Sequence, residues 1–414
     1  MKFMEEGPGI KSGLSDLPKS LNAGTISSGL ISSIFGCTGP ALIIISAAAA
    51  VGFSAQETAS WLFGVYVFGG LIGCILSLYY KAPISGAYAI SAATLMGTAL
   101  AGHTFSEASG AFILAGVIVL VLGVSGLIGK LMKVLPMEIV MAMVAGCMLK
   151  FGVNIVTFTF GVNIADYTFH AKLVCGMAVL AFLIIPNLLK KFPGVLAALI
   201  VGIIAAAATG GFSGSISEVA YIPPSLVKPS FDPSLILSCT LPIAMLVVGA
   251  EGAQAIGVLE AKGYKVPANS MTIMSGIGGI CAGIFGGHNA NIAGPMTAIC
   301  ASEEAGPKDG RYAASVVNGA VFILFGLLSS FAMAFIKLIP QSLISTIAGL
   351  AMINVLIGAF SAAFKSGRYR TGAFFALITG VSGVSIFNIG SAFWALVVGV
   401  IVSLLYDRKD FKKA

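Results

Sequence analysis

The sequence predicts an all-α polytopic membrane protein with about fourteen transmembrane segments in a 7+7 inverted repeat. Apolar residues make up 57% of the 414 residues and charged residues only 9%, whereas soluble domains carry roughly 45–50% and about 25%. Apolar runs long enough to cross a hydrocarbon layer of about 30 Å recur along the whole chain. Two short segments, interrupted by glycine or proline, occupy corresponding places in the two halves, a pattern typical of secondary transporters.

The expected spans form two groups of seven, separated by a polar connection over 211–232. An odd number of crossings in each group places the two halves in opposite orientations. The spans are 24–50, 56–80, 83–97, 108–129, 136–158, 168–188 and 192–210, followed by 233–259, 267–286, 290–301, 312–336, 341–362, 369–386 and 388–406.

The basic residues test this topology. With the N-terminus placed in the cytoplasm, nineteen of the 23 Lys and Arg residues fall in cytoplasmic segments, three fall outside, and Lys150 lies within a span. This asymmetry follows the positive-inside rule, and it accounts for the net charge of +7 without a nucleic-acid partner. The N-terminal segment lacks the apolar core of a cleavable signal peptide. We therefore expect a multi-pass protein of a bacterial-type inner membrane, with both termini in the cytoplasm.

The third and tenth spans, 83–97 and 290–301, are too short to cross a membrane as helices alone. We expect each to begin with a short extended stretch, at about 3.3 Å per residue, and to continue as a half-helix. The helix N-termini, near Gly86–Tyr88 and Gly294–Met296, would face each other at mid-depth, and Pro295 suits a first helical turn. Their free N–H groups favour an anion or a carbonyl acceptor.

Polar residues gather at these interruptions. The stretch FGGHNANIAGPM at 285–296 contains His288 and Asn291, while Tyr88 and Ser91 lie three residues apart on one face of the third span. Non-helical backbone persists at this depth only when it is buried in protein or lines a cavity. The alternatives are an exposed loop over 285–296 and, for the single side chains, helix capping or ordinary packing.

Two charged residues are expected inside the membrane. Glu251 lies nine residues, or roughly 14 Å, from Glu260 at the cytoplasmic end of the eighth span. A carboxylate at that depth must be protonated or paired, so it is a candidate for carrying a proton, with Gln254 on a nearby face. The alternative is a structural hydrogen bond between helices. Lys150 could offset a substrate carboxylate or pair with Glu251, or its long stem could extend to the outer interface.

Other kinds of chemistry lack a signal in the sequence. There is no nucleophile–base pair, metal-ligand spacing or phosphate-binding loop, so we expect no enzyme activity, no cofactor and no metal. The seven cysteines lie almost all in apolar runs without C-x-x-C spacing, which indicates small buried side chains.

Several motifs along the chain resemble the benzoate/proton symporter (BenE) family. They are Gly286-Gly287-His288 with Asn291, the segment MTAICAS, Arg311-Tyr312, Thr58-Ala59-Ser60-Trp61 and Leu241-Pro242. Two features depart from that family's pattern. Glu251-Gly252-Ala253-Gln254 replaces an uncharged Ser-Gln-Asn-like run, and Tyr88 stands where the family usually has tryptophan. A glutamate in the eighth span is more similar to the proton-coupling residue of nucleobase carriers.

The resemblance implies the fold shared by nucleobase and sulfate-permease-type carriers, in which a core domain moves against a gate domain. The substrate then binds between half-helices 3 and 10. The expected parts are an N-terminal segment 1–23, a core domain over 24–129 and 233–336, a gate domain over 136–210 and 341–406, and a basic tail 407–414.

We therefore expect a proton-coupled symporter that imports a small carboxylate, preferably an aromatic one such as benzoate, by alternating access. Glu251 would carry the proton and Lys150 would be its charge partner or that of the substrate. A proton-coupled nucleobase or heterocycle transporter and a proton-independent anion channel or exchanger remain alternatives. The expected partners are the substrate, a proton and the lipid bilayer, and a homodimer stays open. The expected substrate-binding residues are Tyr88, Ser91, Gln254, His288, Asn291, Gly294 and Pro295.

Overall fold

The computed structural model describes residues 4–126, 136–189, 194–211, 221–331, 339–384, 386 and 391–411. The first half contains α1 (Ile10–Ser20), α2 (Ala23–Cys37), α3 (Gly39–Ala50), α4 (Ala55–Tyr80), β1 (Gly86–Ala87), α5 (Ile90–Ala99), α6 (Phe105–Ser125), α8 (Met137–Phe160), α9 (Phe169–Leu188) and α10 (Gly194–Ala208). The second half contains α11 (Pro233–Leu235), α12 (Leu241–Leu246), α13 (Ala253–Ala261), α14 (Ala268–Gly283), β2 (Asn291–Ile292), α15 (Gly294–Cys300), α16 (Tyr312–Leu327), α18 (Gln341–Phe364), α19 (Arg370–Ser382), α20 (Ser391–Tyr406) and α21 (Arg408–Phe411).

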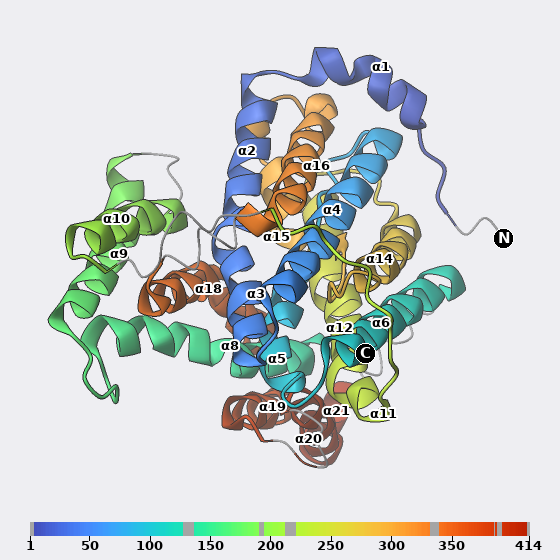
Figure 1. Ribbon diagram of the computed structural model, residues 1–414. Helices are drawn as coiled ribbons and strands as arrows, with labels where there is room; N and C mark the ends of the chain where they lie inside the picture. The colour runs from blue at the N-terminus through green and yellow to red at the C-terminus, as the bar shows by residue number, and fades with distance from the viewer. Residues whose placement is uncertain are drawn as a thin grey trace.

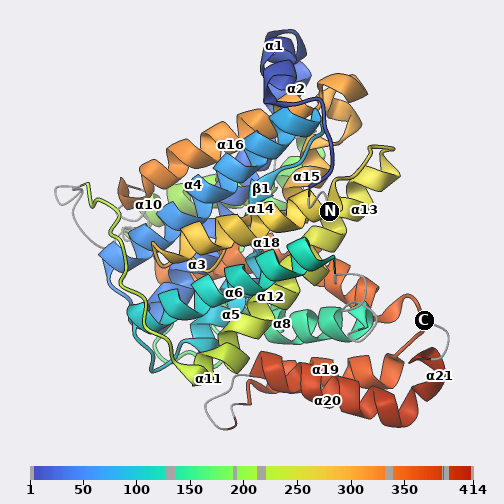
Figure 2. The same ribbon diagram turned by 90° about the vertical axis from the view of Figure 1, so that its right-hand side faces the viewer.

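Among the described residues, seven helical stretches are long and apolar enough to cross a membrane, and several shorter apolar helices accompany them. The first span is broken where the sequence places Thr38, Gly39 and Pro40, since α2 ends at Cys37 and α3 begins at Gly39. The third and tenth spans are the short helices α5 and α15, as predicted. Both chain ends lie on the same side of the molecule in Figure 2, opposite the connection that leads into α11.

The extended stretches before the two half-helices pair with each other. β1 and β2 form an antiparallel two-stranded sheet, with Gly86 opposite Ile292 and Ala87 opposite Asn291. The expected helix start near Gly86–Tyr88 is therefore wrong, because this backbone is used for the sheet and α5 begins only at Ile90. The expected start of the other half-helix at Gly294 is confirmed.

The helices pack in two groups (Figure 1). In the first group, α6 packs on α14, and α16 packs on both α2 and α4. In the second group, α8 packs on α18 and α19, α9 on α10, and α19 on α20. The short helices α3 and α5 contact each other and reach the second group, α3 through α18 and α5 through α8.

The N-terminal segment holds the first group together at the face that carries the chain ends. The Glu5 carboxylate accepts hydrogen bonds from the Asn269 N–H at 2.8 Å and the Ser270 N–H at 2.9 Å. These are among the N–H groups that the first turn of α14 leaves without helical partners, and the residue before α14 offers no side-chain cap. Lys81, just after α4, also forms an ion pair with Asp16 of α1.

We expect Glu5→Gln to lower the melting temperature of the detergent-solubilised protein by roughly 2–4 °C, because the cap of α14 loses its charge. Burial would raise the pKa of Glu5, but hydrogen bonds from Ser270 and Asn269 outweigh burial and hold the pKa below its ordinary 4.5. A carboxyl group with a lowered folded-state pKa stabilises the protein above its unfolded-state pKa and loses this effect as the pH falls. The difference between the two proteins should therefore be full near neutral pH and shrink in acid.

The exposed carboxylate of Glu303, on the same face, supplies the control. An equal loss of melting temperature in Glu303→Gln would contradict the capping role of Glu5, as would a difference that persists unchanged in acid.

Candidate functional site

The start of α5 is held by two residues from the second half of the chain. Asn289 Oδ1 accepts a hydrogen bond from the Ala89 N–H at 3.0 Å, and His288 Nε2 lies 3.0 Å from the Ala89 carbonyl oxygen. Trp61 Nε1 lies 2.9 Å from His288 Nδ1. An indole nitrogen only donates, so Nδ1 accepts and Nε2 carries the proton donated to Ala89. His288 is fully buried with both ring nitrogens bonded, which makes it a brace between the two half-helix segments.

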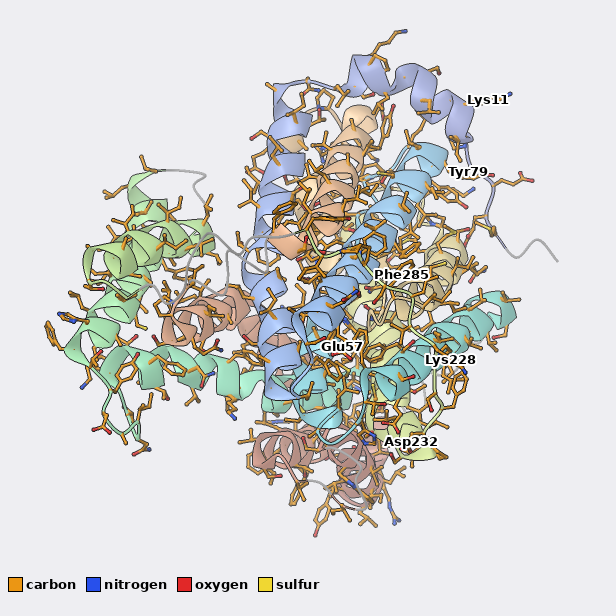
Figure 3. The ribbon with its side chains drawn as sticks, in the orientation of Figure 1. Lys11, Glu57, Tyr79, Lys228, Asp232 and Phe285 are labelled. Atoms are coloured by element: carbon orange, nitrogen blue, oxygen red, sulfur yellow. The ribbon has the colours of Figure 1, made fainter. Side chains whose placement is uncertain are left out.

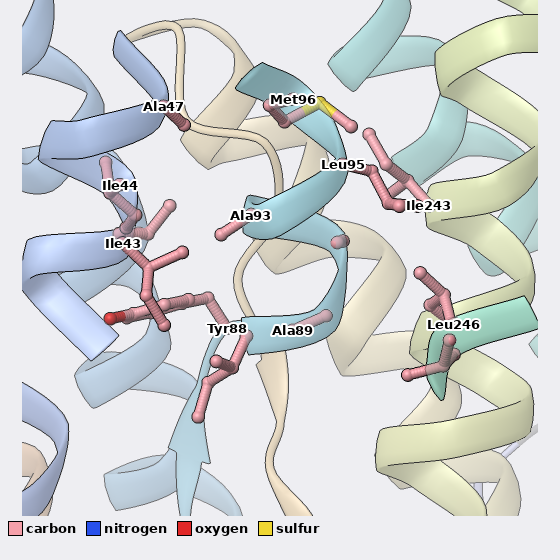
Figure 4. Close-up of a cluster of buried hydrophobic side chains, with 14 of the residues drawn as sticks. Ile43, Ile44, Ala47, Tyr88, Ala89, Ala93, Leu95, Met96, Ile243 and Leu246 are labelled. Carbon is pink, nitrogen blue, oxygen red and sulfur yellow. The ribbon is translucent and has the colours of Figure 1, made fainter. Parts of the chain in front are cut away.

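Tyr88 precedes α5 and is also enclosed. Its hydroxyl lies 2.8 Å from the Tyr66 hydroxyl, which in turn donates to the Gly36 carbonyl oxygen at 2.5 Å. The Tyr88 ring contacts the rings of Tyr66 and His288 edge-on, with centroids 5.2 and 5.5 Å apart. Figure 4 shows the ring extending from the end of β1 toward Ile43 on α3. Tyr88 is therefore fully packed between the start of α5 and its neighbours on α3 and α4.

Glu251 lies in an irregular part of the eighth span. The stretch Val247–Gly252 is π-helical between α12 and α13, a geometry that is frequent at functional sites. Glu251 is only 6% exposed, and its Oε2 accepts a hydrogen bond from the Gly294 N–H at 3.2 Å. The backbone N–H of Ile90 also interacts electrostatically with this carboxylate. Glu251 thus bridges the first residues of α5 and α15.

The remaining predicted residues lie around this bridge. A Cβ atom placed on Gly294 would come within 2.5 Å of Gln254 Oε1, so the Gln254 side chain lies directly over the start of α15. Pro295 occupies the first turn of α15, as its position in the sequence predicts. Asn291 is fully buried in β2, and its Nδ2 donates to the Ile292 carbonyl oxygen. The Ser91 hydroxyl and Asn291 Oδ1 are buried and have no hydrogen-bond partner among the described residues.

A cavity of about 540 Å³ lies between α3 and α5 on one side and α8, α19 and α20 on the other. This size is ordinary for a small-molecule site. It lies toward the ends of α3 and α5, at the face opposite the chain termini, and its polar lining includes Ser46, Thr94, Lys150, Asn154 and Ser391. Among the described residues, no carboxylate lies within ion-pair distance of Lys150, so the expected pairing with Glu251 does not occur in this structure.

Three features of the site are missing from the sequence prediction: the π-helical turn, the hydrogen bond between Trp61 and His288, and the hydrogen bond from the Ala89 N–H to the Asn289 side chain. The position of Trp61 in a motif shared with a known family was the only signal for any of them.

The family model described as benzoate membrane transport protein matches residues 19–405. The chain belongs to the benzoate membrane transport (BenE) family. It is 30% identical over 394 residues to the inner membrane protein YdcO of Escherichia coli, covering 94% of this chain and 98% of that protein. It is 23% identical over 374 residues to the benzoate membrane transport protein of Acinetobacter baylyi, covering 90% and 92%.

Solved structures place this BenE-family chain in a wider fold. The transmembrane domain of the cyanobacterial bicarbonate transporter BicA matches with a TM-score of 0.63 at 16% identity, over 92% of this chain and 96% of that chain. SLC26A9 matches with a TM-score of 0.65 at 15% identity, over 95% of this chain and 67% of that chain. These likenesses confirm the inverted-repeat fold. The BenE-family chain is a multi-pass membrane transporter, and the family is not one of enzymes.

Proposed function

We propose that this BenE-family transporter is a proton-coupled symporter that imports a small aromatic carboxylate such as benzoate. One observation carries the proposal: the buried carboxylate of Glu251 accepts a hydrogen bond from the Gly294 N–H where α15 begins and interacts with the Ile90 N–H where α5 begins. Backbone that binds one carboxylate at this depth has the geometry and the polarity to bind another. A relative that is 23% identical carries benzoate transport in its name.

The proposed movement is alternating access of a core domain, 24–129 with 233–336, against a gate domain, 136–210 with 341–406. The packing supports this division, since α6, α14, α4 and α16 contact one another, while α8 packs on α18 and α19. The cavity lies between the two groups of helices, where a relative movement would open or close it.

The proposed substrate pocket combines polar and aromatic groups. Ser91 and Asn291 offer buried oxygens without hydrogen-bond partners, and Gln254 adds an uncharged amide beside Gly294. Tyr88 supplies an aromatic wall for a flat ring. His288 and Pro295 act indirectly in this scheme, since His288 braces Ala89 and Pro295 sets the first turn of α15.

Glu251 carries the coupled proton in this proposal. A buried acid that exchanges a proton inside a membrane protein is well suited to such a role. One anion and one proton moving together carry no net charge, so uptake should follow the pH gradient rather than the voltage. In proteoliposomes, an inward proton gradient should drive accumulation of radiolabelled benzoate, and a voltage of either sign should change it little. Accumulation that follows voltage alone, without a pH change evoked by substrate, would instead indicate an anion channel or exchanger.

A nucleobase or related heterocycle is a second candidate substrate. The observation that favours it is the Glu251 carboxylate beside the Gln254 amide, because such a pair can bind the N–H and C=O groups of a heterocycle. Competition of uracil, xanthine and benzoate for uptake distinguishes the two classes.

Lys150 lines the cavity and has no ion-pair partner among the described residues, so we propose that it attracts the anionic substrate. We expect Lys150→Gln to raise the KM for benzoate roughly three- to tenfold with a smaller change in kcat. High salt should reduce the difference, since ions screen such attraction. Lys228→Gln, which removes an exposed charge on the long connection (Figure 3), is the matched control. An unchanged KM in Lys150→Gln would remove Lys150 from the substrate pathway.

We also propose that both termini lie in the cytoplasm, because the predicted topology then places nineteen of the 23 Lys and Arg residues on the cytoplasmic side. A homodimer stays a prediction. Labelling of single added cysteines near either terminus by an impermeant reagent, in intact cells and in opened ones, tests the orientation.

A further inference from the structure

The backbone N–H groups that would bind a substrate carboxylate already interact with the carboxylate of Glu251. The Gly294 N–H donates to Glu251 Oε2 at 3.2 Å, and the Ile90 N–H contacts the same carboxylate. The neighbouring Ser91 hydroxyl is more than nine-tenths buried and has no hydrogen-bond partner among the described residues. The two N–H groups face a carboxylate, and this carboxylate is part of the chain.

We infer that the Glu251 carboxylate is a tethered competitor of the substrate, which must leave the N–H groups of Ile90 and Gly294 before a substrate carboxylate can bind them. The inference rests on the proposed function, in which the substrate is a carboxylate bound at this place. It adds a reason for coupling: two carboxylates cannot share the same donors when both are ionised, because their repulsion at this depth is strong.

Protonation of Glu251 removes this conflict. A neutral carboxyl group holds backbone N–H groups less strongly than a carboxylate does, and it no longer repels an incoming anion. Proton binding at Glu251 and substrate binding therefore favour each other, as thermodynamic linkage requires. Loss of the proton would return the carboxylate to the donors and expel the substrate.

Among the described residues, no basic side chain forms an ion pair with Glu251. The elements packed around Glu251 include α8, α13, α14, α15 and β2. The titratable side chains on these elements or at the start of α5 are Glu138, Cys147, Lys150, Glu260, Cys281, Cys300 and Tyr88.

The test is the pH dependence of benzoate binding to the full-length purified protein, measured by calorimetry or thermal shift between about pH 6 and pH 8. Benzoate is ionised throughout this range, since ordinary carboxylic acids titrate near pH 4. For the wild-type protein we expect the affinity to rise as the pH falls, by up to tenfold per pH unit for one coupled proton. Glu251→Gln keeps the size of the side chain and cannot ionise, so its affinity should vary less than twofold over the same range.

Glu260→Gln, at the exposed end of α13, is the matched control and should keep the wild-type pH dependence. The inference that Glu251 competes with the substrate is overturned if the wild-type affinity for benzoate varies less than twofold between about pH 6 and pH 8. It is also overturned if Glu251→Gln retains the wild-type pH dependence. Failure of the proposed function gives a different result, because benzoate would then bind neither protein at any pH.

A second inference comes from a separate cluster at the opposite face from the chain ends. His103 Nδ1 lies 3.7 Å from Glu107 Oε2 and 3.7 Å from Asp232 Oδ2, and the three donor atoms lie within 4.8 Å of one another. The three residues are half-buried. Asp232, labelled in Figure 3, begins the eighth span, whereas His103 and Glu107 flank the start of α6.

We propose that His103, Glu107 and Asp232 bind a zinc ion. An imidazole nitrogen and two carboxylate oxygens are ordinary zinc ligands, and tetrahedral coordination at 2.0–2.2 Å places such ligand atoms about 3.3–3.6 Å apart. The two separations from His103 need only slight tightening, whereas the carboxylate oxygens of Glu107 and Asp232, which lie within 4.8 Å of each other, must come closer when the ion binds. Asp232 Oδ1 is bound by the Ser234 N–H at 2.8 Å, which orients the carboxylate and leaves Oδ2 to the ion. A bound ion would tie the α5–α6 connection to the start of the eighth span.

Zinc added to chelator-stripped protein near pH 7.5 should raise the melting temperature by at least roughly 3 °C, since a ligand that binds only the folded state stabilises it. His103→Gln should abolish the shift, and His170→Gln, which alters an exposed histidine on α9, should retain it. The proposed zinc site would be contradicted if zinc did not change the melting temperature of the wild-type protein, or if it raised that of His103→Gln equally.

Discussion

Replacement of Glu251 by glutamine should abolish proton-driven accumulation of benzoate and leave benzoate exchange in place. For one coupled proton, a gradient of one pH unit, worth about 1.36 kcal/mol, can concentrate substrate up to about tenfold. Without an ionisable group at this position, no proton moves with the substrate and the proton gradient cannot drive uptake. The ratio of internal to external benzoate concentration should therefore fall to about one. Exchange of labelled for unlabelled substrate moves no net proton, so it should continue.

Uptake and counterflow, measured in the same proteoliposomes, separate loss of coupling from loss of folding. A variant that fails in both assays is uninformative about coupling unless it binds benzoate, and the binding measurement above decides that point. Glu260→Gln should behave as wild type in both assays. Undiminished accumulation by Glu251→Gln would remove Glu251 from the coupling mechanism.

Much of the fold follows from local features of the sequence. The two short spans are set by proline, glycine and segment length, and the structure has a short helix in each of them. The burial of Glu251 follows from counting residues along a helix, and it is 6% exposed. Each of these features depends on residues that are close together in the chain, which is why sequence reasoning reaches them.

The parts that sequence reasoning missed depend on residues far apart in the chain. The pairing of β1 with β2 moves the start of α5 to Ile90, and nothing near Gly86 indicates that a strand from the other half lies beside it. His288 looked like a substrate ligand because it is a polar residue at a helix break. Its partners, Trp61 and Ala89, lie in the other half of the chain, and with both nitrogens bonded it has no further hydrogen-bonding capacity for a ligand.

Gly86→Ala should be among the most damaging single substitutions in the chain. A Cβ atom on Gly86 would lie 2.0 Å from the Gly69 carbonyl oxygen and 2.7 Å from the Gly73 nitrogen, both backbone atoms of α4. Neither can rotate away as a side chain could, so β1 must move off α4. We expect a loss of stability of roughly 3 kcal/mol or more and a fall of at least about 5 °C in melting temperature.

Gly257→Ala is the matched control, since Gly257 lies in α13 and a Cβ atom there meets no atom within 4 Å. Alanine is favoured over glycine in a helix by roughly 0.5–1 kcal/mol, so this variant should be as stable as the wild type or slightly more so. The folded fraction of Gly86→Ala should also bind benzoate more weakly, because β1 leads directly to Ala89 and to the Ile90 N–H. A Gly86→Ala protein with wild-type melting temperature and affinity would mean that the fit of β1 against α4 does not position the start of α5.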